Sequence, residues 1–156
     1  MENSSQYPER NKLIISDLKK LLQLVNNSKE DYKHASELTK NPHFYRFFIK
    51  QERQREGYAE ELSAHIAVHG GKADKKEDGL IEKIHDSWVS IKAVFTGHSD
   101  SELFDEIIKV ESNALSVFDT CIADYPHHVD HLGLLVKQRD SIYIALEELA
   151  TLKASL

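Results

Sequence analysis

The sequence predicts an all-α fold, in which four long helices pair as two antiparallel hairpins joined by a long crossover that contains a shorter helix. Two observations carry this prediction. Apolar residues recur at alternating spacings of three and four over long stretches, which is the pattern of amphipathic helices. Glycine and proline are few, at six and three of 156 residues, and they cluster at a handful of places. A strand-rich fold needs turn residues at shorter intervals.

The predicted boundaries divide the chain into a tail and one domain. Residues 1–8 are polar and are expected to form a flexible N-terminal tail. Residues 9–156 are expected to form a single domain, because a chain of this length supports one hydrophobic core. The predicted helices cover about residues 9–39, 42–69, 79–96 (within the crossover), 100–124 and 126–154.

Strong start and stop residues delimit the first hairpin. Asn41 is a good N-cap, and Pro42 is a good first helical residue. Gly70 and Gly71 end the second helix, since glycine readily adopts the conformation that closes a helix. A link of only a few residues makes the two long helices antiparallel neighbours.

The crossover and the second hairpin show similar signals. Apolar residues at helical spacing surround Trp88, and we expect this stripe to seal the crossover against a hairpin. Gly97 ends that helix. Ser99 and Glu102 have the spacing of a capping box, which opens the next helix. Pro126 marks the start of the last one.

Composition and charge exclude several classes of function. The formal net charge is -6, with no basic block, which disfavours nucleic acid and anionic membranes as partners. No run of about 18 apolar residues exists to span a membrane, and no secretory signal is evident. The single Cys121 fits a reducing compartment and a small apolar packing role, so a cytoplasmic location is expected. No nucleotide-binding glycine motif or nucleophile elbow is present, which favours a non-enzyme.

Polar side chains interrupt the apolar stripes at one level of the predicted bundle. Reflecting the second hairpin about a turn at Asp124 and Tyr125 places Glu111 opposite Gln138. Apolar patterning does not produce such a layer by default. The predicted layer comprises Ser28, Asp31, Tyr32, Gln51, Glu52, Arg55, Glu111 and Gln138.

Three parts of the chain carry a family resemblance. They are the crossover segment 88–97 (WVSIKAVFTG), the Gly70-Gly71 helix end, and Glu111 with Ala114. Two helical hairpins joined by a long crossover resemble the ferritin-like superfamily. Within it, nearly the whole chain resembles an uncharacterised bacterial family of ferritin-like bundles, a domain of unknown function. The resemblance implies a ferritin-like four-helix bundle, and analogy to the family suggests a role associated with stress.

The superfamily's metal sites use one Glu on each of two helices and Glu-x-x-His on each of the other two. By position, the resemblance implies Asp31, Glu52 and Glu111 as the metal ligands of this chain. Arg55 stands where the first histidine is expected, and Gln138 replaces the second Glu of the pattern. Arg55 thus supplies a fixed positive charge where a metal needs a neutral donor.

Two hypotheses of function follow from this layer. In the first, Arg55 pairs with Glu111 or Glu52 as a buried ion pair that fixes helix register, and the chain is a non-catalytic bundle without a cofactor. In the second, Asp31, Glu52 and Glu111 bind iron or another divalent metal, and the chain is an oxidoreductase or an iron-handling protein.

Histidines offer a second candidate metal site. His65 and His69, like His127 and His131, are spaced four apart on a predicted helix, and the topology places both pairs at one end of the bundle. Ferritin-like sites lie at mid-height with carboxylates, so we interpret these histidines as solvated or packed. Oligomeric state stays open, with a homodimer as the default expectation because dimers are the commonest closed assembly.

Overall fold

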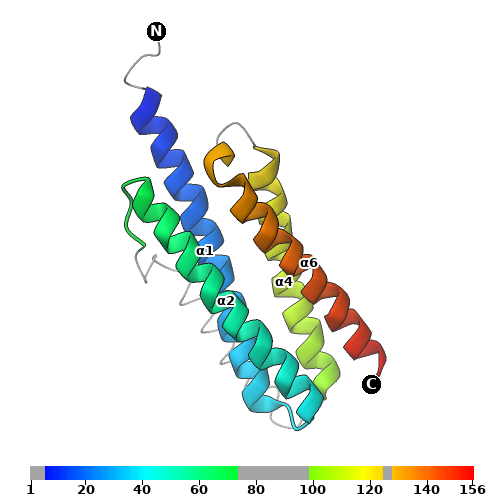
Figure 1. The fold of residues 1–156 in the computed structure, drawn as a ribbon. Helices are drawn as coiled ribbons and strands as arrows, with labels where there is room; N and C mark the ends of the chain where they lie inside the picture. Colours follow the sequence, from blue (N-terminus) through cyan, green and yellow to red (C-terminus); the bar gives the residue numbers. More distant parts are fainter. Residues whose placement is uncertain (1–5, 74–98, 125–127) are drawn as a thin grey trace.

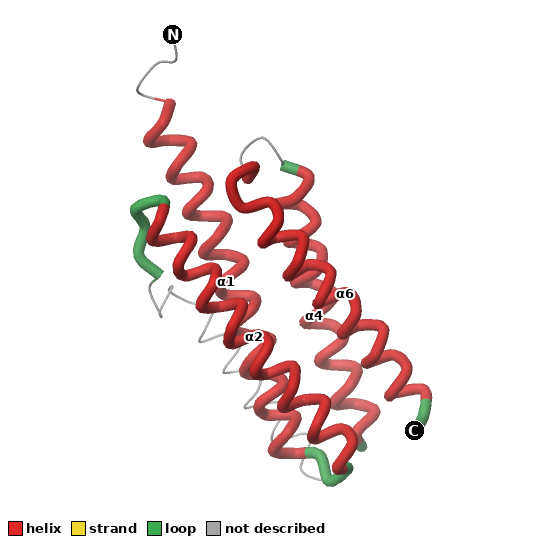
Figure 2. Tube along the Cα trace, viewed as in Figure 1, coloured by secondary structure: helices red, strands yellow, loops and turns green. Residues whose placement is uncertain are grey.

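The computed structural model describes residues 6–73, 99–124 and 128–156. The long helices lie side by side (Figure 1), and helix makes up nearly all of the described chain (Figure 2). No strand occurs among these residues. The elements are α1 (Gln6–Leu38), α2 (Pro42–Val68), α4 (Asp100–Ala123), the short 3-10 helix η1 (Val129–His131) and α6 (Leu132–Ala154).

The four helices form two antiparallel hairpins, α1 with α2 and α4 with α6 (Figure 1). The end of α2 and the start of α4 lie at opposite ends of the bundle, which is the arrangement that a long crossover between hairpins requires. The predicted crossover helix 79–96 and the Trp88 stripe lie outside the described residues. The fold class predicted from the sequence is confirmed for the part of the chain that the structure describes.

The turns of the first hairpin follow the sequence signals. The Asn41 side chain accepts hydrogen bonds from the backbone N–H of His43 at 2.9 Å and of Phe44 at 3.3 Å, and Pro42 begins α2. Gly70 has a φ of 86°, the left-handed conformation that favours glycine at a helix end. A Cβ at Gly71 would lie 2.9 Å from methyl groups of Ile15 and Ile66, so α1 packs directly against this turn.

The second hairpin departs from the prediction in the cap of α4, which begins at Asp100 as predicted, and in the start of α6. Ser99 is the N-cap of α4, but its side chain makes no capping hydrogen bond. The last α-helix begins at Leu132 rather than near residue 126, because η1 precedes it. His128 is the N-cap of η1 and His131 is its last residue, and both side chains are buried.

The core consists of two apolar clusters at the two ends of the bundle. Along α1, α2 and α4, buried polar residues separate the clusters. The cluster near the start of α1 has as its largest fully buried members Leu18, Leu21, Leu62, Ile66, Phe118, Leu135 and Ile142. The other is mainly aromatic and contains Tyr32, Phe44, Phe47, Phe48, Phe104, Ile107 and Leu149.

Candidate functional site: a buried ion pair and a histidine cluster

Glu111 of α4 is the acceptor at the centre of the bundle. It is fully buried, and both of its carboxylate oxygens are used. Oε2 accepts from Arg55 Nη2 at 2.6 Å and from the Tyr32 hydroxyl at 2.9 Å, and Oε1 accepts from the Ser28 hydroxyl. We call Ser28, Tyr32, Arg55 and Glu111 the central layer. Three helices contribute to it, so it ties the first hairpin to the second.

Arg55 of α2 is also fully buried. Besides Glu111, its guanidinium donates to Ser28 Oγ at 3.3 Å and to Gln54 Oε1 at 2.8 Å. Its Cζ lies 5.8 Å from the ring centroids of both Tyr32 and Tyr58, within the range of cation–π attraction. Burial acts to lower the pKa of Arg55, but the Glu111 carboxylate, together with Tyr32 and Tyr58, raises the pKa above its ordinary value. The charge is therefore permanent and compensated.

The Tyr32 hydroxyl stays protonated in this layer. Burial raises the pKa of Tyr32 well above its usual range, and the negative charge of Glu111 raises it further. A protonated phenol donates its hydrogen to Glu111, which is the direction that the carboxylate requires.

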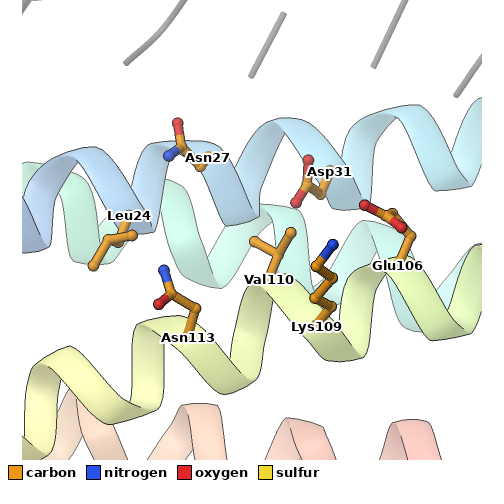
Figure 3. A pocket seen from close by; sticks show the side chains of 7 residues that line it. All are labelled: Leu24, Asn27, Asp31, Glu106, Lys109, Val110 and Asn113. Carbon is orange, nitrogen blue, oxygen red and sulfur yellow. The ribbon is translucent and has the colours of Figure 1, made fainter. Parts of the chain in front are cut away.

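Asp31 lies beside the central layer and faces a different space. It lines a pocket of about 270 Å³ between α1 and α4, together with Glu106 and Lys109 (Figure 3). Its side chain is 1% exposed. Burial, with the Glu111 carboxylate as the next cause, raises the pKa of Asp31 to about 8. At neutral pH this carboxyl group is therefore mostly uncharged.

The remaining predicted residues lie apart from the ion pair. Gln51 and Gln138 are buried, and each has a side-chain oxygen without a hydrogen-bond partner. Gln138 Nε2 donates to the backbone oxygen of Tyr58 at 3.3 Å, and not to Glu111. Its place opposite Glu111 was predicted from a turn at residues 124–125. Because α6 begins only at Leu132, the midpoint of the hairpin lies further along the chain.

The central layer does not fit the metal pair of the ferritin-like pattern. Glu111 uses its oxygens on three donors, and the cationic Arg55 lies in contact with it. Glu52 is half-buried on α2, one position away from the buried stripe. Within the described ranges, the ligand atoms of Asp31, Glu52 and Glu111 do not gather as a metal-binding group.

Histidines meet at the end of the bundle where α1 begins. The ring of His131 lies 5.9 Å from that of His65 and 5.6 Å from that of His69, so the predicted meeting of α2 and the last helix is observed. His127 lies outside the described residues. Burial, followed by the neighbouring histidines, lowers the pKa of His131 to about 4, so its ring is neutral at pH 7.

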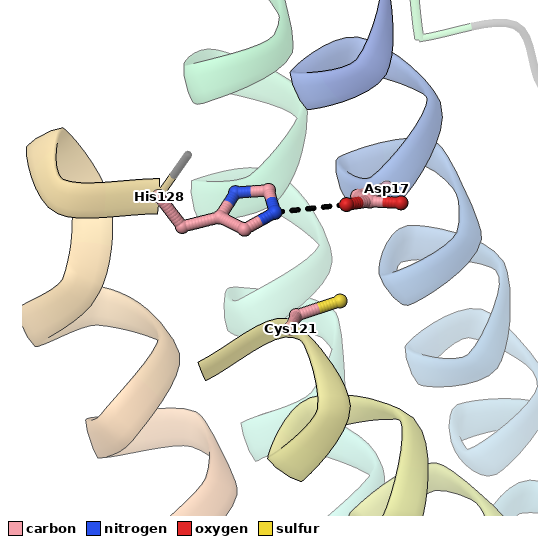
Figure 4. Close-up of side chains that lie close together, drawn as sticks. All are labelled: Asp17, Cys121 and His128. Atoms are coloured by element: carbon pink, nitrogen blue, oxygen red, sulfur yellow. Dashed lines mark hydrogen bonds and ion pairs between the residues drawn. The ribbon is translucent and has the colours of Figure 1, made fainter. Parts of the chain in front are cut away.

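The sequence analysis missed three residues that complete this region. His128 Nδ1 lies 2.8 Å from His131 Nε2, and His128 Nε2 lies 2.8 Å from Asp17 Oδ2. Cys121 of α4 lies beside them (Figure 4). We call Asp17, Cys121, His128 and His131 the end cluster. The available signal was the spacing of three between His128 and His131, which would place both rings on one side of a helical turn.

Comparison with known proteins places this fold in a class and then in a family. A solved structure of a Dps1 mutant from Mycobacterium smegmatis matches with a TM-score of 0.73 and 15% identity, over 92% of this chain and 96% of that one. At this identity the likeness shows the fold alone, a ferritin-like four-helix bundle. Residues 13–124 match the family described as "Domain of unknown function (DUF2383)", and the chain belongs to that family. No curated protein matches the chain.

Proposed function

We propose that this chain is a non-catalytic helical-bundle protein, in which a buried ion pair takes the position of the superfamily's metal centre. The contact between Arg55 Nη2 and Glu111 Oε2 supports this proposal, because it is 2.6 Å long and neither side chain is exposed. A buried pair is a poor source of net stability, but any slip of one helix past another would leave a charge unpaired. The pair therefore fixes the register between α2 and α4.

On this proposal the protein works through packing and self-association in the cytoplasm, in a role associated with stress. No helix of the described segments is long and apolar enough to cross a membrane. On α6, Val136, Tyr143 and Ile144 are exposed at positions that share one face of the helix. We expect a homodimer, as the commonest closed assembly. Light scattering on the purified chain measures this directly, and a monomer at all concentrations contradicts it.

The alternative is an iron-binding oxidoreductase or iron-handling protein that uses Asp31, Glu52 and Glu111. One observation favours it, since the Asp31 and Glu111 carboxyl groups lie close enough for the charge of Glu111 to raise the pKa of Asp31. Two carboxyl groups in one buried region are the usual start of a ferritin-like site. Against it, Arg55 already compensates the charge of Glu111.

Metal analysis separates the two hypotheses. The chain, purified without a histidine tag, is loaded aerobically with ferrous iron and compared with Glu111→Ala and with Glu60→Ala, a change at an exposed position of α2. The proposal predicts that iron content does not depend on Glu111. About two irons per chain, lost in Glu111→Ala and kept in Glu60→Ala, would overturn it in favour of the di-iron alternative.

A further inference from the structure

The end cluster brings three different donor types to one point. Asp17 comes from α1, Cys121 from α4, and His128 from the N-cap position of η1 (Figure 4). One carboxylate oxygen, the Sγ atom and one ring nitrogen all lie within 4.8 Å of one another. His128 is fully buried and Cys121 is 5% exposed. The three side chains thus come from three separate elements, unlike a chance group of neighbouring residues on one surface helix.

We propose that Asp17, Cys121 and His128 bind a divalent transition metal of the zinc class. Thiolate sulfur, imidazole nitrogen and carboxylate oxygen are the ligands that zinc takes in proteins, with bonds of about 2.0–2.3 Å. Hard ions such as magnesium and calcium prefer oxygen ligands alone, so the cysteine and the histidine disfavour them. Three protein ligands leave one tetrahedral position for water.

The second nitrogen of His128 has the partner that a metal-binding imidazole needs. His128 Nδ1 and His131 Nε2 are 2.8 Å apart, so an Nδ1–H of His128 can donate a hydrogen bond to His131 Nε2. That tautomer leaves the lone pair of His128 on Nε2, which faces Asp17 at 2.8 Å. Metal-bound histidines almost always donate their other N–H in this way. His131 is therefore a positioning residue for the site.

The metal would take the place of the thiol proton of Cys121. His128 Nε2 and Asp17 Oδ2, which lie 2.8 Å apart, would both face the ion. A coordinated thiol is deprotonated, because the charge of the ion outweighs the cost of burying the thiolate. That proton leaves to solvent, and no electron transfer is involved.

The site has a route to solvent. The side chain of Asp17 is 18% exposed, whereas that of His128 is fully enclosed. A pocket of about 310 Å³ opens at the same end of the bundle. Its lining residues are Arg10, Asn11, Ile14, His69, Val129 and Asp130. Two of these, Val129 and Asp130, are the residues between His128 and His131, so the pocket lies next to the cluster.

Cobalt(II) substitution tests the proposal on the intact, reduced, tag-free chain. Four-coordinate cobalt gives intense visible bands, and a thiolate ligand adds a charge-transfer band in the near ultraviolet. Since Cys121 is the only cysteine, this band identifies the ligand in the wild-type protein itself. We expect the band to saturate at about one cobalt per chain and zinc to remove it, because zinc binds such sites more tightly.

Variants separate the ligands from their support. Cys121→Ser should lose the band, and Asp17→Asn should keep it with at least tenfold weaker binding. His131→Phe should also keep the band, with about 10–100-fold weaker binding, as is usual for the partner of a metal-bound histidine. His43→Asn, at an exposed position of α2, is the matched control and should change neither property.

Several outcomes would overturn the site. They are no cobalt binding, binding without the charge-transfer band in wild type, or binding that His43→Asn weakens as much as Asp17→Asn does. The site is independent of the proposed function, because iron that depends on Glu111 would leave the cobalt result unchanged.

Discussion

The central layer and the end cluster both bury ionisable side chains, but they differ in how the charges and hydrogen-bonding atoms of these side chains are matched. In the central layer, Arg55 brings a permanent cation to Glu111, and hydroxyl donors occupy the remaining acceptor positions. In the end cluster, His128 is shared between Asp17 and His131. The Nδ1 atom of His131 is buried without a hydrogen-bond partner.

This difference teaches where a ferritin-like bundle can take an ion. A site whose charges and donors are already matched gains little from a metal, because the ion must displace a resident cation. A site of imidazole, thiol and one carboxylate offers donor atoms that a metal ion can share once their protons leave. We therefore propose that this bundle takes an ion at its end rather than at mid-height.

The largest expected effect comes from removing the cation of the central layer. Arg55→Met leaves Glu111 buried with an uncompensated charge, and such losses typically cost about 3–5 kcal/mol. The free energy of unfolding in urea measures it. Arg53→Met, at an exposed position two residues away, is the control and should change stability by less than about 0.5 kcal/mol. Equal effects of the two substitutions would remove the distinction between the layer and the surface.

Removing one donor from Glu111 should have a smaller effect. Tyr32→Phe keeps the aromatic ring but deletes the hydroxyl that lies 2.9 Å from Glu111 Oε2. Hydrogen bonds to charged groups contribute about 1.5–3 kcal/mol, so a loss of that size is expected in urea unfolding. Tyr45→Phe, at an exposed ring, is the matched control. A neutral Tyr32→Phe would show that the hydroxyl does not support the ion pair.

The pH dependence of stability should report on Asp31. Its pKa is about 8 in the folded chain and near 3.8 when unfolded, so between these values the folded chain holds a proton that the unfolded chain has lost. The contribution of Asp31 to stability is therefore full below about pH 4 and falls as pH rises toward 8, by at most about 1.4 kcal/mol per pH unit. Asp31→Asn should flatten the profile between pH 5 and pH 8, and Glu60→Gln should not.

The smallest effect is expected at the surface. Lys137 and Glu61 form an exposed ion pair with an N–O distance of 3.6 Å. Exposed pairs contribute about 0–1 kcal/mol, because solvent and salt screen them. Glu61→Gln should therefore change the free energy of unfolding less than Arg55→Met, Tyr32→Phe or Asp31→Asn does. A loss as large as that of Arg55→Met would contradict the link between burial and the energetic role of charge in this bundle.

The sequence was sufficient to predict the hairpins and a buried ion pair of Arg55, with Glu111 or Glu52 as its partner; the structure shows Glu111. Apolar spacing fixed the inward face of each helix, and Asn41 and Gly70 fixed the turn and the end of the first hairpin. Once the inward face and the turns are known, the rise per residue of an α-helix gives the position of each polar residue along the bundle axis. The same reasoning placed Gln138 by a turn at residues 124–125, before the structure showed η1.

The end cluster could not be predicted in the same way. Asp17 is one residue away from the buried Leu18, so periodicity gives no reason to turn its side chain toward Cys121. His128 is the N-cap of the short 3-10 helix η1, which the 3.6-residue period of an α-helix does not describe. Contacts between segments that are distant in sequence, such as Asp17 with His128, depend on packing that no local pattern encodes.

A double-mutant cycle between Arg55 and Glu111 tests the central claim most directly. Arg55→Met, Glu111→Leu and the double variant are compared with wild type in urea unfolding at one pH. Each single variant should lose about 3–5 kcal/mol, and the double variant should recover much of that loss, since two apolar side chains leave no buried charge. Losses that simply add in the double variant would contradict the claim that these residues form one compensated pair.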